Sequence, residues 1–394
     1  MNCRKNALEG TRLWRLFGFA FFGLVLGLAL SCSTLSATAE EPATASAPTP
    51  TPAPAPAPAP AEFQPPALLN PDGWTLVLIP DPQTYQRCSL NQGIFDMMTA
   101  WIADNIERLN IQQVLCVGDI VQANNTEKFV KPNMNQTSAQ MWAAAARAFE
   151  RLDGKVPYVL CTGNHDHGFI GSENRDSQLP KYFPITKNPA WNGVLVATKD
   201  EGSLVNAAYE FTAPGGQKIL TLSLEYSPTD DDLEWARQLV SSEKYADHFV
   251  ILLTHAYLNT HFGNSTRTKD GKGDGNSGEQ IWTKLVQPSR NIRMVFCGHL
   301  SHHSDLRGCT GFRVDKNAAD LPVFQLLFNT QSIGQNNGGN GWLQLFEFSR
   351  DMKTVHVRTF SPLFERIPSK RSAAWNRNDC CEFTFQLDGE AKQP

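Results

Sequence analysis

Apolar residues are grouped along the chain in short runs, with segments of helical periodicity between them. The first run after the N-terminal region is WTLVLIP, and behind it FDMMTAWIADNIERL repeats its apolar positions at intervals of three and four. The same alternation continues through QVLCVGD, SAQMWAAAARAFERL and VPYVLCTGNHD. This order predicts a β-α-β-α-β unit whose three strands are parallel neighbours.

The second half of the chain is also rich in strand-like runs. It begins with YEFTA and KILTLSLE, which precede DDDLEWARQLV, a predicted helix with three acidic residues in its first turn. Two buried strands follow in FVILLTH and IRMVFCGH, and the C-terminal part has four more strand-like runs, PVFQLLF, GWLQLFEF, TVHVRTF and EFTFQL. We therefore predict an α/β fold in which two mixed β-sheets pack together and are flanked by helices.

Five of these apolar runs end in a polar group, as in IPDPQ, VGD, TGNHD, LTH and CGH. Ligands of open α/β sheets bind in the crevice beyond the carboxyl ends of the strands. We therefore expect the polar residues at these strand ends to share one rim. They are Asp81, Asp119, Asn164, His165, Asp166, His255 and His299.

Aspartate, asparagine and histidine side chains suit divalent Mn, Fe or Zn and require no thiolate partner. A phosphate ester resists attack because its oxygens are anionic. Two metal ions about 3.5–4 Å apart can hold those oxygens and generate a hydroxide nucleophile. A nearby imidazole can then protonate the leaving oxygen. The rim residues therefore indicate a metal site of a kind that could hydrolyse a phosphate ester.

The order of these motifs resembles that of the calcineurin-like metallophosphoesterases. Their pattern is D-x-H, GD, GNH[DE], a lone His after a strand, and GHxH. This chain has DPQ, GD, GNHD, TH and GH in the same order within residues 74–360, each at the end of a predicted strand. Single motifs such as GD or DPQ are common turns, so the ordered set carries the resemblance. It implies that the two-sheet sandwich is the metallophosphoesterase fold.

The resemblance also implies roles for individual residues. It makes Asp119 the ligand that bridges two metal ions and His165 the general acid. Asp81 would bind the first metal. The ligands that would complete the shell of the second metal are Asn164, His255 and His299.

The chain departs from the family pattern at two ligands of the first metal. Gln83 stands in place of the histidine of D-x-H, and Ser301 in place of the last histidine of GHxH. We therefore expect two divalent ions, of Mn, Fe or Zn, with the first held more weakly and Gln83 as a tentative oxygen ligand. Many relatives orient the acid histidine with an aspartate three residues beyond GD, where this chain has Gln122.

Three further residues are tentative metal or substrate ligands. Asn124 could contact phosphate or cap a turn. Asp166 belongs to the GNHD motif, and His302 is either a substitute ligand or part of a solvated loop. Residues 168–205 and 259–278 read as long loops beside the rim, and such loops commonly shape a binding pocket.

The N-terminal region has the layout of an export signal. Four basic residues precede an apolar run at residues 16–30, which is shorter than the roughly 20 residues of a membrane span. The segment after this run is compatible with cleavage after Ala39, with lipidation of Cys32 and with an uncleaved N-terminal anchor. We predict a signal at residues 1–39, a Pro/Ala-rich spacer at 40–66 and the phosphoesterase domain at 67–394.

The net charge of −4 shows no basic excess, which argues against a nucleic-acid partner. The cysteines have no spacing typical of a disulfide scaffold. We expect an exported phosphoesterase that hydrolyses a mono- or diester with metal-activated water, in a bacterial periplasm, at the cell surface or secreted. Its partners would be the phosphate ester and, through Cys32, a lipid membrane. Two alternatives remain: a catalytically weak relative that binds a phosphorylated ligand or polymer, and a surface adhesion protein.

Overall fold

The computed structural model describes residues 63–388, apart from 263–264, 303–304 and 335–336. The predicted signal, Cys32 and most of the spacer lie outside the described residues. Phe63 packs against the hydrophobic core, and the carbonyl oxygen of Gln64 accepts a hydrogen bond of 2.8 Å from Trp375 Nε1. Contacts with the folded domain therefore begin before residue 67. Within the described ranges, the chain has no helix with the length and apolar character needed to cross a membrane.

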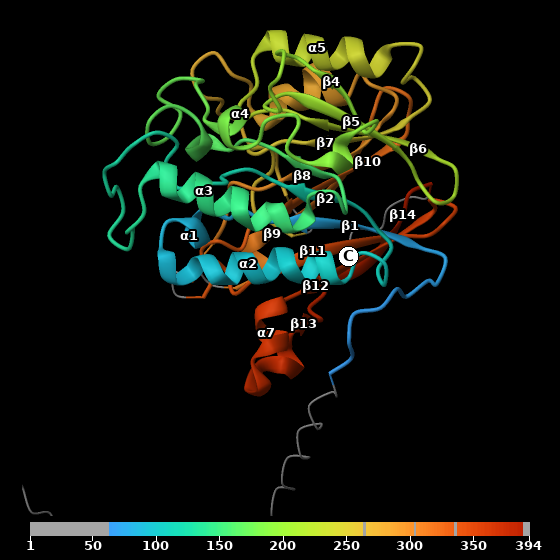
Figure 1. Cartoon of the computed structure of the whole chain (residues 1–394). Helices are drawn as coiled ribbons and strands as arrows, with labels where there is room; N and C mark the ends of the chain where they lie inside the picture. The colour runs from blue at the N-terminus through green and yellow to red at the C-terminus, as the bar shows by residue number, and fades with distance from the viewer. Residues whose placement is uncertain (1–62, 263–264, 303–304, 335–336, 389–394) are drawn as a thin grey trace, which may run out of the picture. The chain divides into compact units, whose positions relative to one another are not determined.

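The fold contains two seven-stranded β-sheets (Figure 1). The first has the order β13-β12-β11-β1-β2-β3, with β14 also paired to β12. Its strands are β1 (Trp74–Ile79), β2 (Ile111–Cys116), β3 (Tyr158–Leu160), β11 (Leu343–Phe348), β12 (Thr354–Phe360), β13 (Trp375–Asn376) and β14 (Glu382–Gln386). β1, β2 and β3 are parallel neighbours, which confirms the predicted β-α-β-α-β unit.

The second sheet has the order β4-β5-β6-β7-β8-β10-β9. Its strands are β4 (Leu195–Thr198), β5 (Ala207–Thr212), β6 (Lys218–Ser223), β7 (Phe249–Leu253), β8 (Ile292–Cys297), β9 (Thr310–Lys316) and β10 (Pro322–Phe328). The central strands β6, β7, β8 and β10 are parallel, whereas the strands at both edges pair antiparallel. Both sheets are therefore mixed, as predicted.

The two sheets are joined by buried contacts between their inner faces. The rings of Phe296 on β8 and Phe346 on β11 lie 4.7 Å apart, edge to face. The hydroxyl of Ser223 on β6 donates to the carbonyl of Leu160 on β3 at 3.0 Å. Truncation of a buried phenylalanine such as Phe346 to alanine typically costs about 3–5 kcal/mol. This shared core fixes the strand ends of one sheet relative to those of the other.

Helices lie outside the sheets, with α2 and α3 beside the first sheet and α5 over the second (Figure 1). The α-helices are α1 (Gln83–Gln86), α2 (Ser89–Asp104), α3 (Ser138–Phe149), α4 (Leu179–Tyr182), α5 (Asp230–Ser241), α6 (Gly278–Ile281) and α7 (Pro362–Arg366). Capping boxes begin α3 at Thr137 and α5 at Thr229, which explains why these helices start where they do.

One of the long loops predicted from the sequence contains regular structure. Residues 168–205 include α4, a short 3₁₀ turn at Pro189–Trp191 and the edge strand β4. All four residues of β4 are only partly buried, so this edge strand lacks the apolar alternation that reveals half-buried strands in a sequence. Residues 259–278 form an irregular connection in their described part, as predicted, apart from a bridge between Leu258 and Arg267.

Candidate metal centre

The candidate centre forms where five parallel strands end. Strands β1, β2 and β3 of the first sheet are followed by Asp81, Asp119 and Asn164. Strands β7 and β8 of the second sheet are followed by His255 and His299. Because the sheets pack face to face, the carboxyl ends of all five strands meet at one rim, as the sequence predicted.

The turns after the strands are tight enough to require glycine beside the polar residues. Gly118 has φ of +105°, and a Cβ there would lie 2.7 Å from His255 Nδ1. A Cβ at Gly163 would collide with Asp119, and one at Gly298 with Asp81. These three glycines are the ones in the GD, GNHD and GH motifs. They allow the backbone of one strand end to approach the side chain of another.

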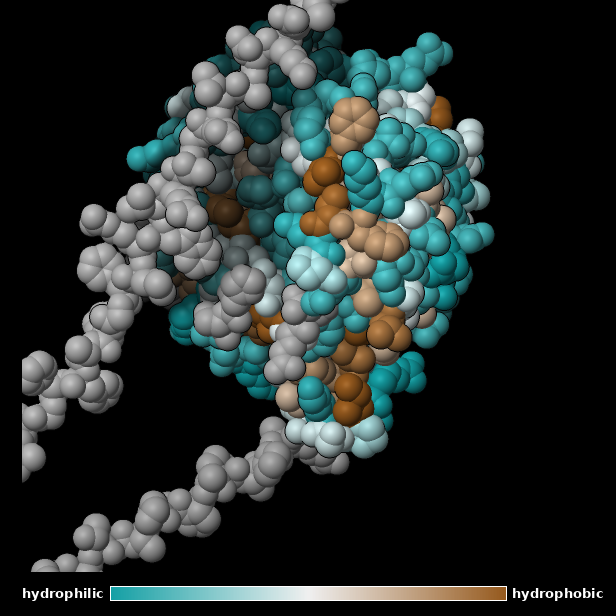
Figure 2. Space-filling view, turned by 90° about the vertical axis from the view of Figure 1, so that its left-hand side faces the viewer, coloured by the Kyte–Doolittle hydropathy of each residue, from teal (hydrophilic) through white to brown (hydrophobic). Residues whose placement is uncertain are grey.

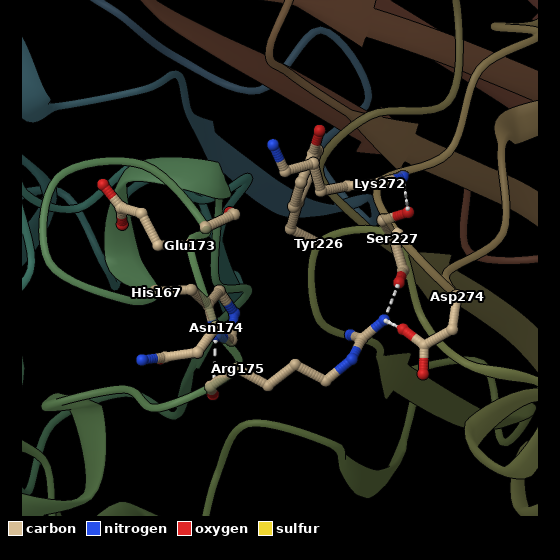
Figure 3. Close-up of a pocket in the computed structure, with 10 residues that line it drawn as sticks. His167, Glu173, Asn174, Arg175, Tyr226, Ser227, Lys272 and Asp274 are labelled. Atoms are coloured by element: carbon tan, nitrogen blue, oxygen red, sulfur yellow. Dashed lines mark hydrogen bonds and ion pairs between the residues drawn. The ribbon is translucent and has the colours of Figure 1, made fainter.

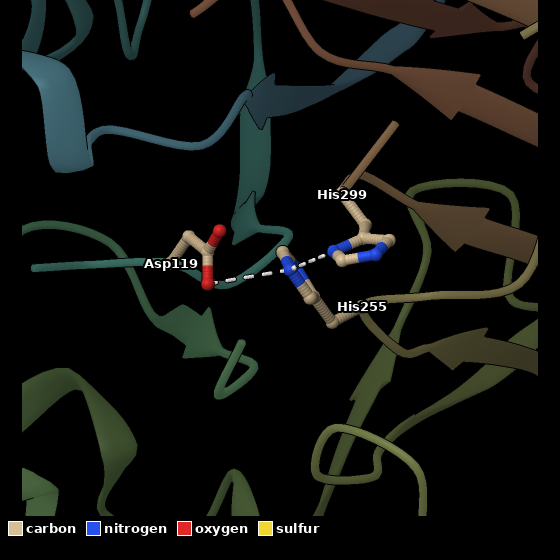
Figure 4. Close-up of side chains that lie close together, drawn as sticks. All are labelled: Asp119, His255 and His299. Carbon is tan, nitrogen blue, oxygen red and sulfur yellow. Dashed lines mark hydrogen bonds and ion pairs between the residues drawn. The ribbon is translucent and has the colours of Figure 1, made fainter. Parts of the chain in front are cut away.

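A compact cluster of ligand atoms is formed by Asp119, His255 and His299 (Figure 4). One atom from each residue lies within 4.8 Å of the other two. His255 Nε2 is 3.3 Å from Asp119 Oδ1 and 3.2 Å from His299 Nδ1. The amide oxygen of Asn164 also lies 3.2 Å from His255 Nε2. The structure thus brings together the four residues that the resemblance assigns to the second metal.

The hydrogen bonds of His255 orient its ring for coordination. Its Nδ1 lies 2.8 Å from the carbonyl oxygen of Val117, which can only accept, so Nδ1 carries a proton. Nε2 is then the nitrogen that faces the cluster. A backbone carbonyl that holds the second ring nitrogen in this way is the usual support of a metal-binding histidine.

The charges around the cluster favour a cation. Burial alone would lower the pKa of His255, but the carboxylates of Asp119 and Asp81 outweigh it and raise this pKa to about 9. Burial and the neighbouring His255 lower the pKa of His299 to about 4. Burial would raise the pKa of Asp119, yet His255 and His165 together hold it below its ordinary value. A carboxylate, an amide oxygen and two imidazoles around a stabilised positive charge fit a divalent metal ion.

Asp81 is engaged differently. Its Oδ2 accepts hydrogen bonds from the backbone N–H of His299 at 3.1 Å, from Asn329 Nδ2 at 2.8 Å and from Gln331 Nε2 at 3.2 Å. Gln83 Nε2 donates to Gln331 Oε1. Burial raises the pKa of Asp81 well above its ordinary value. This arrangement does not fit a metal ion bound between Asp81 and Gln83.

Ser301 is the residue at the other altered position. Among the described contacts, its side chain has none with the residues of the candidate centre. Its hydroxyl oxygen lies 3.4 Å from Cys309 Sγ. Sequence reasoning missed Asn329 and Gln331, although the signal was present. Strand PVFQLLF is followed by the polar segment NTQ, so β10 ends in the same manner as the other five strands of the rim.

His165 lies at the edge of the cluster. Its backbone N–H donates to Asp119 Oδ1 at 3.0 Å, and its Nδ1 is 3.3 Å from Gln122 Nε2 and 3.1 Å from the carbonyl oxygen of Ile170. Arg87 donates to Gln122 Oε1 at 3.2 Å. Gln122, in place of the family's orienting aspartate, therefore still contacts His165, the expected general acid, but through an amide. Sequence reasoning missed Arg87, which follows α1 and carries no motif.

Asp166, one of the tentative ligands, holds the backbone instead. It is buried and accepts hydrogen bonds from the backbone N–H groups of Gly163, Ile120 and Val121 at 2.8–3.0 Å. It thereby ties the GNHD turn to the segment after GD.

Asn124 and His302 do not contact the cluster within the described chain. Asn124 donates to the carbonyls of Gly168 and Asp176 and accepts from the N–H of Gln178, so it anchors the loop after GNHD. His302 is exposed, and its backbone N–H donates to Gly308.

Figure 3 shows a pocket of about 180 Å³, which Tyr226 connects to the cluster. Its walls come from residues 172–175, from 272–274 and from Tyr226, so both predicted long loops contribute. The ring of Tyr226 lies 5.9 Å from that of His255 and 5.7 Å from that of His299, which makes it the boundary between pocket and centre. Tyr226 was not identified from the sequence. The signal was the polar end of the run LSLEY, which follows β6.

Some charged residues of the pocket are paired with protein groups, and others are not. Arg175 Nη2 lies 2.9 Å from Asp274 Oδ1, and Nη1 lies 3.4 Å from Glu225. The carboxylate of Glu173 accepts N–H groups of its own loop at 2.8–3.2 Å. Lys272 is exposed and has no ion pair among the described residues. It is therefore the pocket cation best placed to meet an anionic ligand.

Figure 2 shows the side of the molecule on which α1 lies in Figure 1. Most of this face is hydrophilic, with hydrophobic side chains gathered in a band beside a hollow. Large apolar residues exposed in the described chain include Phe169 and Ile170, on the loop whose carbonyl contacts His165. Apolar surface is thus available close to His165.

Comparison with known proteins agrees with this geometry. A family model for calcineurin-like phosphoesterases matches residues 75–302. This range includes every strand end of the candidate centre, and the chain belongs to the calcineurin-like phosphoesterase family. The family expected from the motif order is therefore confirmed.

Two curated proteins are similar to this chain over long ranges. YvnB, an uncharacterized protein of Bacillus subtilis (strain 168), is 30% identical over 329 residues, which are 82% of this chain and 22% of YvnB. Purple acid phosphatase 22 of Arabidopsis thaliana is 23% identical over 232 residues, which are 56% of this chain and 45% of that protein. The chain thus matches less than half the length of either relative.

A solved structure of GAP50, described as the anchor in the inner membrane complex of Plasmodium, is also similar. Its sequence is 11% identical and its TM-score is 0.41, over 82% of this chain and 90% of that one. A likeness at this level carries no information on function.

Proposed function

We propose that this protein hydrolyses a phosphate mono- or diester at a divalent metal ion held by Asp119, Asn164, His255 and His299. The observation that carries this proposal is the buried cluster of Asp119, His255 and His299, whose ligand atoms lie within 4.8 Å of one another. A bound divalent ion would polarise a phosphoryl oxygen and lower the pKa of water at this position. Membership in the phosphoesterase family supports the same reaction class.

His165 is the proposed general acid, and its neighbours define which nitrogen carries the proton. Arg87 donates to Gln122 Oε1 and so fixes the amide with its Nε2 toward His165 Nδ1. Nδ1 of the neutral ring then accepts, and Nε2 holds the proton that a leaving oxygen needs. When both nitrogens are protonated, Nδ1 can donate to the carbonyl of Ile170, 3.1 Å away. Either protonation state therefore has a partner.

The pocket beside Tyr226 is the proposed site for the substituent of the ester. It adjoins the cluster directly, and its walls include one aromatic face and the ammonium of Lys272. A substrate with an anionic or polar group beyond the reacting phosphate would match these walls. Export to the periplasm or the surface, with or without a lipid anchor at Cys32, is proposed from the sequence alone.

The proposal is tested by metal analysis and hydrolysis assays on the same preparations. Wild-type protein loaded with Mn²⁺, Fe²⁺ or Zn²⁺ should hydrolyse a chromogenic phosphate mono- or diester, and His299→Ala should lose both the metal and the activity. His302→Ala is the matched control, because this exposed histidine follows His299 closely in the chain but does not contact the cluster. A His299→Ala variant that retains full metal content and turnover would exclude the assigned site.

The second candidate is a phosphate-binding relative with little turnover. One observation favours it: three N–H donors occupy Asp81 Oδ2, one of the two oxygens with which Asp81 could bind a metal ion. In that case the wild-type protein would bind metal and a non-hydrolysable phosphate ester, yet show no hydrolysis above a metal-free control with any of the three metals.

A further inference from the structure

We propose that the centre of this protein holds a single divalent ion, and that the carboxamide of Gln331 fills the space between Asp81 and Gln83 in place of a second ion. The inference rests on the metal site proposed above, at Asp119, Asn164, His255 and His299, but not on any reaction at that site. It assigns to Gln331, a residue outside all five family motifs, the role of excluding a second ion.

The direction of the hydrogen bonds fixes the arrangement. Asp81 Oδ2 accepts from Gln331 Nε2 at 3.2 Å, so the nitrogen of this carboxamide faces Asp81 and its oxygen faces Gln83. Gln83 must then present its own nitrogen, and Gln83 Nε2 does donate to Gln331 Oε1. An amide nitrogen has no lone pair to offer a metal. The amide nitrogens of Gln83 and Gln331 therefore cannot coordinate an ion here, and the oxygen of Gln331 accepts the N–H of Gln83.

Gln331 is held in place by its own loop. Its backbone N–H donates to Asn329 Oδ1 at 3.1 Å. Asn329 is fully buried, and its Nδ2 donates to Asp81 Oδ2 at 2.8 Å and to the carbonyl of His299 at 3.0 Å. Asp81 Oδ2 thus has three N–H partners, from Asn329, Gln331 and the backbone of His299.

The remaining residues at this place are weak ligands. The hydroxyl of Ser301 contacts Cys309 Sγ at 3.4 Å. The carbonyl oxygen of Gln83 is buried and has no hydrogen-bond partner among the described residues. This oxygen is the one Gln83 atom that could coordinate, whereas its amide nitrogen is taken up by the hydrogen bond to Gln331.

The experiment is an equilibrium titration of the full chain with Mn²⁺, followed by calorimetry and by electron paramagnetic resonance of the bound ion. We expect one Mn²⁺ per chain with an uncoupled spectrum, lost in His299→Ala. Gln331→Glu keeps the size of the side chain but replaces the N–H donor with a carboxylate beside Asp81. This variant should bind a second Mn²⁺ and show an exchange-coupled pair. Gln112→Glu is the control, because it makes the same change at the end of β2 that lies away from the centre. This variant should bind one ion.

The outcomes separate this inference from the proposed function. Two exchange-coupled ions in the wild type would overturn the inference, as would a folded Gln331→Glu variant that still binds one. No bound ion in the wild type would instead contradict the metal site itself. If Gln331→Glu fails to fold, the number of Mn²⁺ ions bound by the wild type still tests the single-ion proposal. Neither measurement depends on hydrolysis.

Discussion

His255 Nδ1 donates a hydrogen bond of 2.8 Å to the carbonyl oxygen of Val117, and this bond joins the two sheets at the centre. His255 follows β7 of the second sheet, whereas Val117 follows β2 of the first. The same contact that packs the sheets therefore orients the proposed ligand nitrogen. Metal binding and domain stability should be coupled through this residue.

We expect His255→Ala to abolish stabilisation of the protein by metal. A ligand at 100 times its Kd stabilises the native state by about 2.7 kcal/mol, which is measurable as a higher midpoint of thermal unfolding. Added Mn²⁺ should raise the midpoint of the wild type but leave that of His255→Ala unchanged. The exposed His302→Ala serves as the control and should respond as the wild type does. An equal response of His255→Ala would show that the ion binds elsewhere.

Metal binding should release a proton at neutral pH. The pKa of His255 is raised to about 9 in the metal-free protein, so at pH 7 the ring carries a proton that a cation must displace. Apparent affinity should therefore rise by about tenfold per pH unit up to pH 9 and level off above it. Calorimetry at pH 7 in buffers of different ionisation enthalpy measures the proton directly. An observed enthalpy that is independent of the buffer would contradict protonation of His255.

His165→Ala should retain the metal while losing turnover. The residue contacts Asp119 through its backbone N–H, which alanine preserves, so the ligand cluster should remain intact. Loss of a general acid typically lowers rates by about 100- to 10,000-fold, most of all for esters with poor leaving groups. Metal content and kcat should be compared across esters of graded leaving-group pKa. A uniform loss across that series would remove His165 from the acid role.

Lys272→Ala should weaken binding of substrates that carry a second anionic group. The ammonium lines the pocket and has no ion pair among the described residues, so it is available to the ligand. We expect KM to rise about tenfold, equivalent to 1.4 kcal/mol, with kcat nearly unchanged. Lys269→Ala, another exposed lysine of the same loop that does not line the pocket, should leave KM as it is. Identical KM values for the two variants would exclude Lys272 from substrate binding.

If Cys32 is lipidated, the protein will partition with membranes and Cys32→Ser will release it. A soluble wild-type product that begins at Glu40 would instead indicate cleavage after Ala39 without an anchor. Mass spectrometry of the mature N-terminus distinguishes these outcomes.

The parts of the fold that were predictable are those governed by local patterns. Apolar runs and helical periodicity reveal β1, β2 and β3 and their parallel order, because strand propensity and the β-α-β connection are properties of neighbouring residues. Polar residues at the strand ends then indicate Asp119, His255 and His299, since parallel strands must deliver their carboxyl ends to one rim. The edge strand β4 was missed because its half-buried residues carry little alternation.

The environment of Asp81 could not be read in the same way. Gln331 is 250 positions away in the chain, and which side of its carboxamide meets Asp81 depends on how Asn329, Gln83 and the backbone of His299 pack around it. Hydrogen bonds between distant residues follow from the packing of the two sheets and leave no periodic trace along the chain. Local sequence therefore specifies which residues reach the rim, and long-range packing specifies which of them still have lone pairs free for a metal ion.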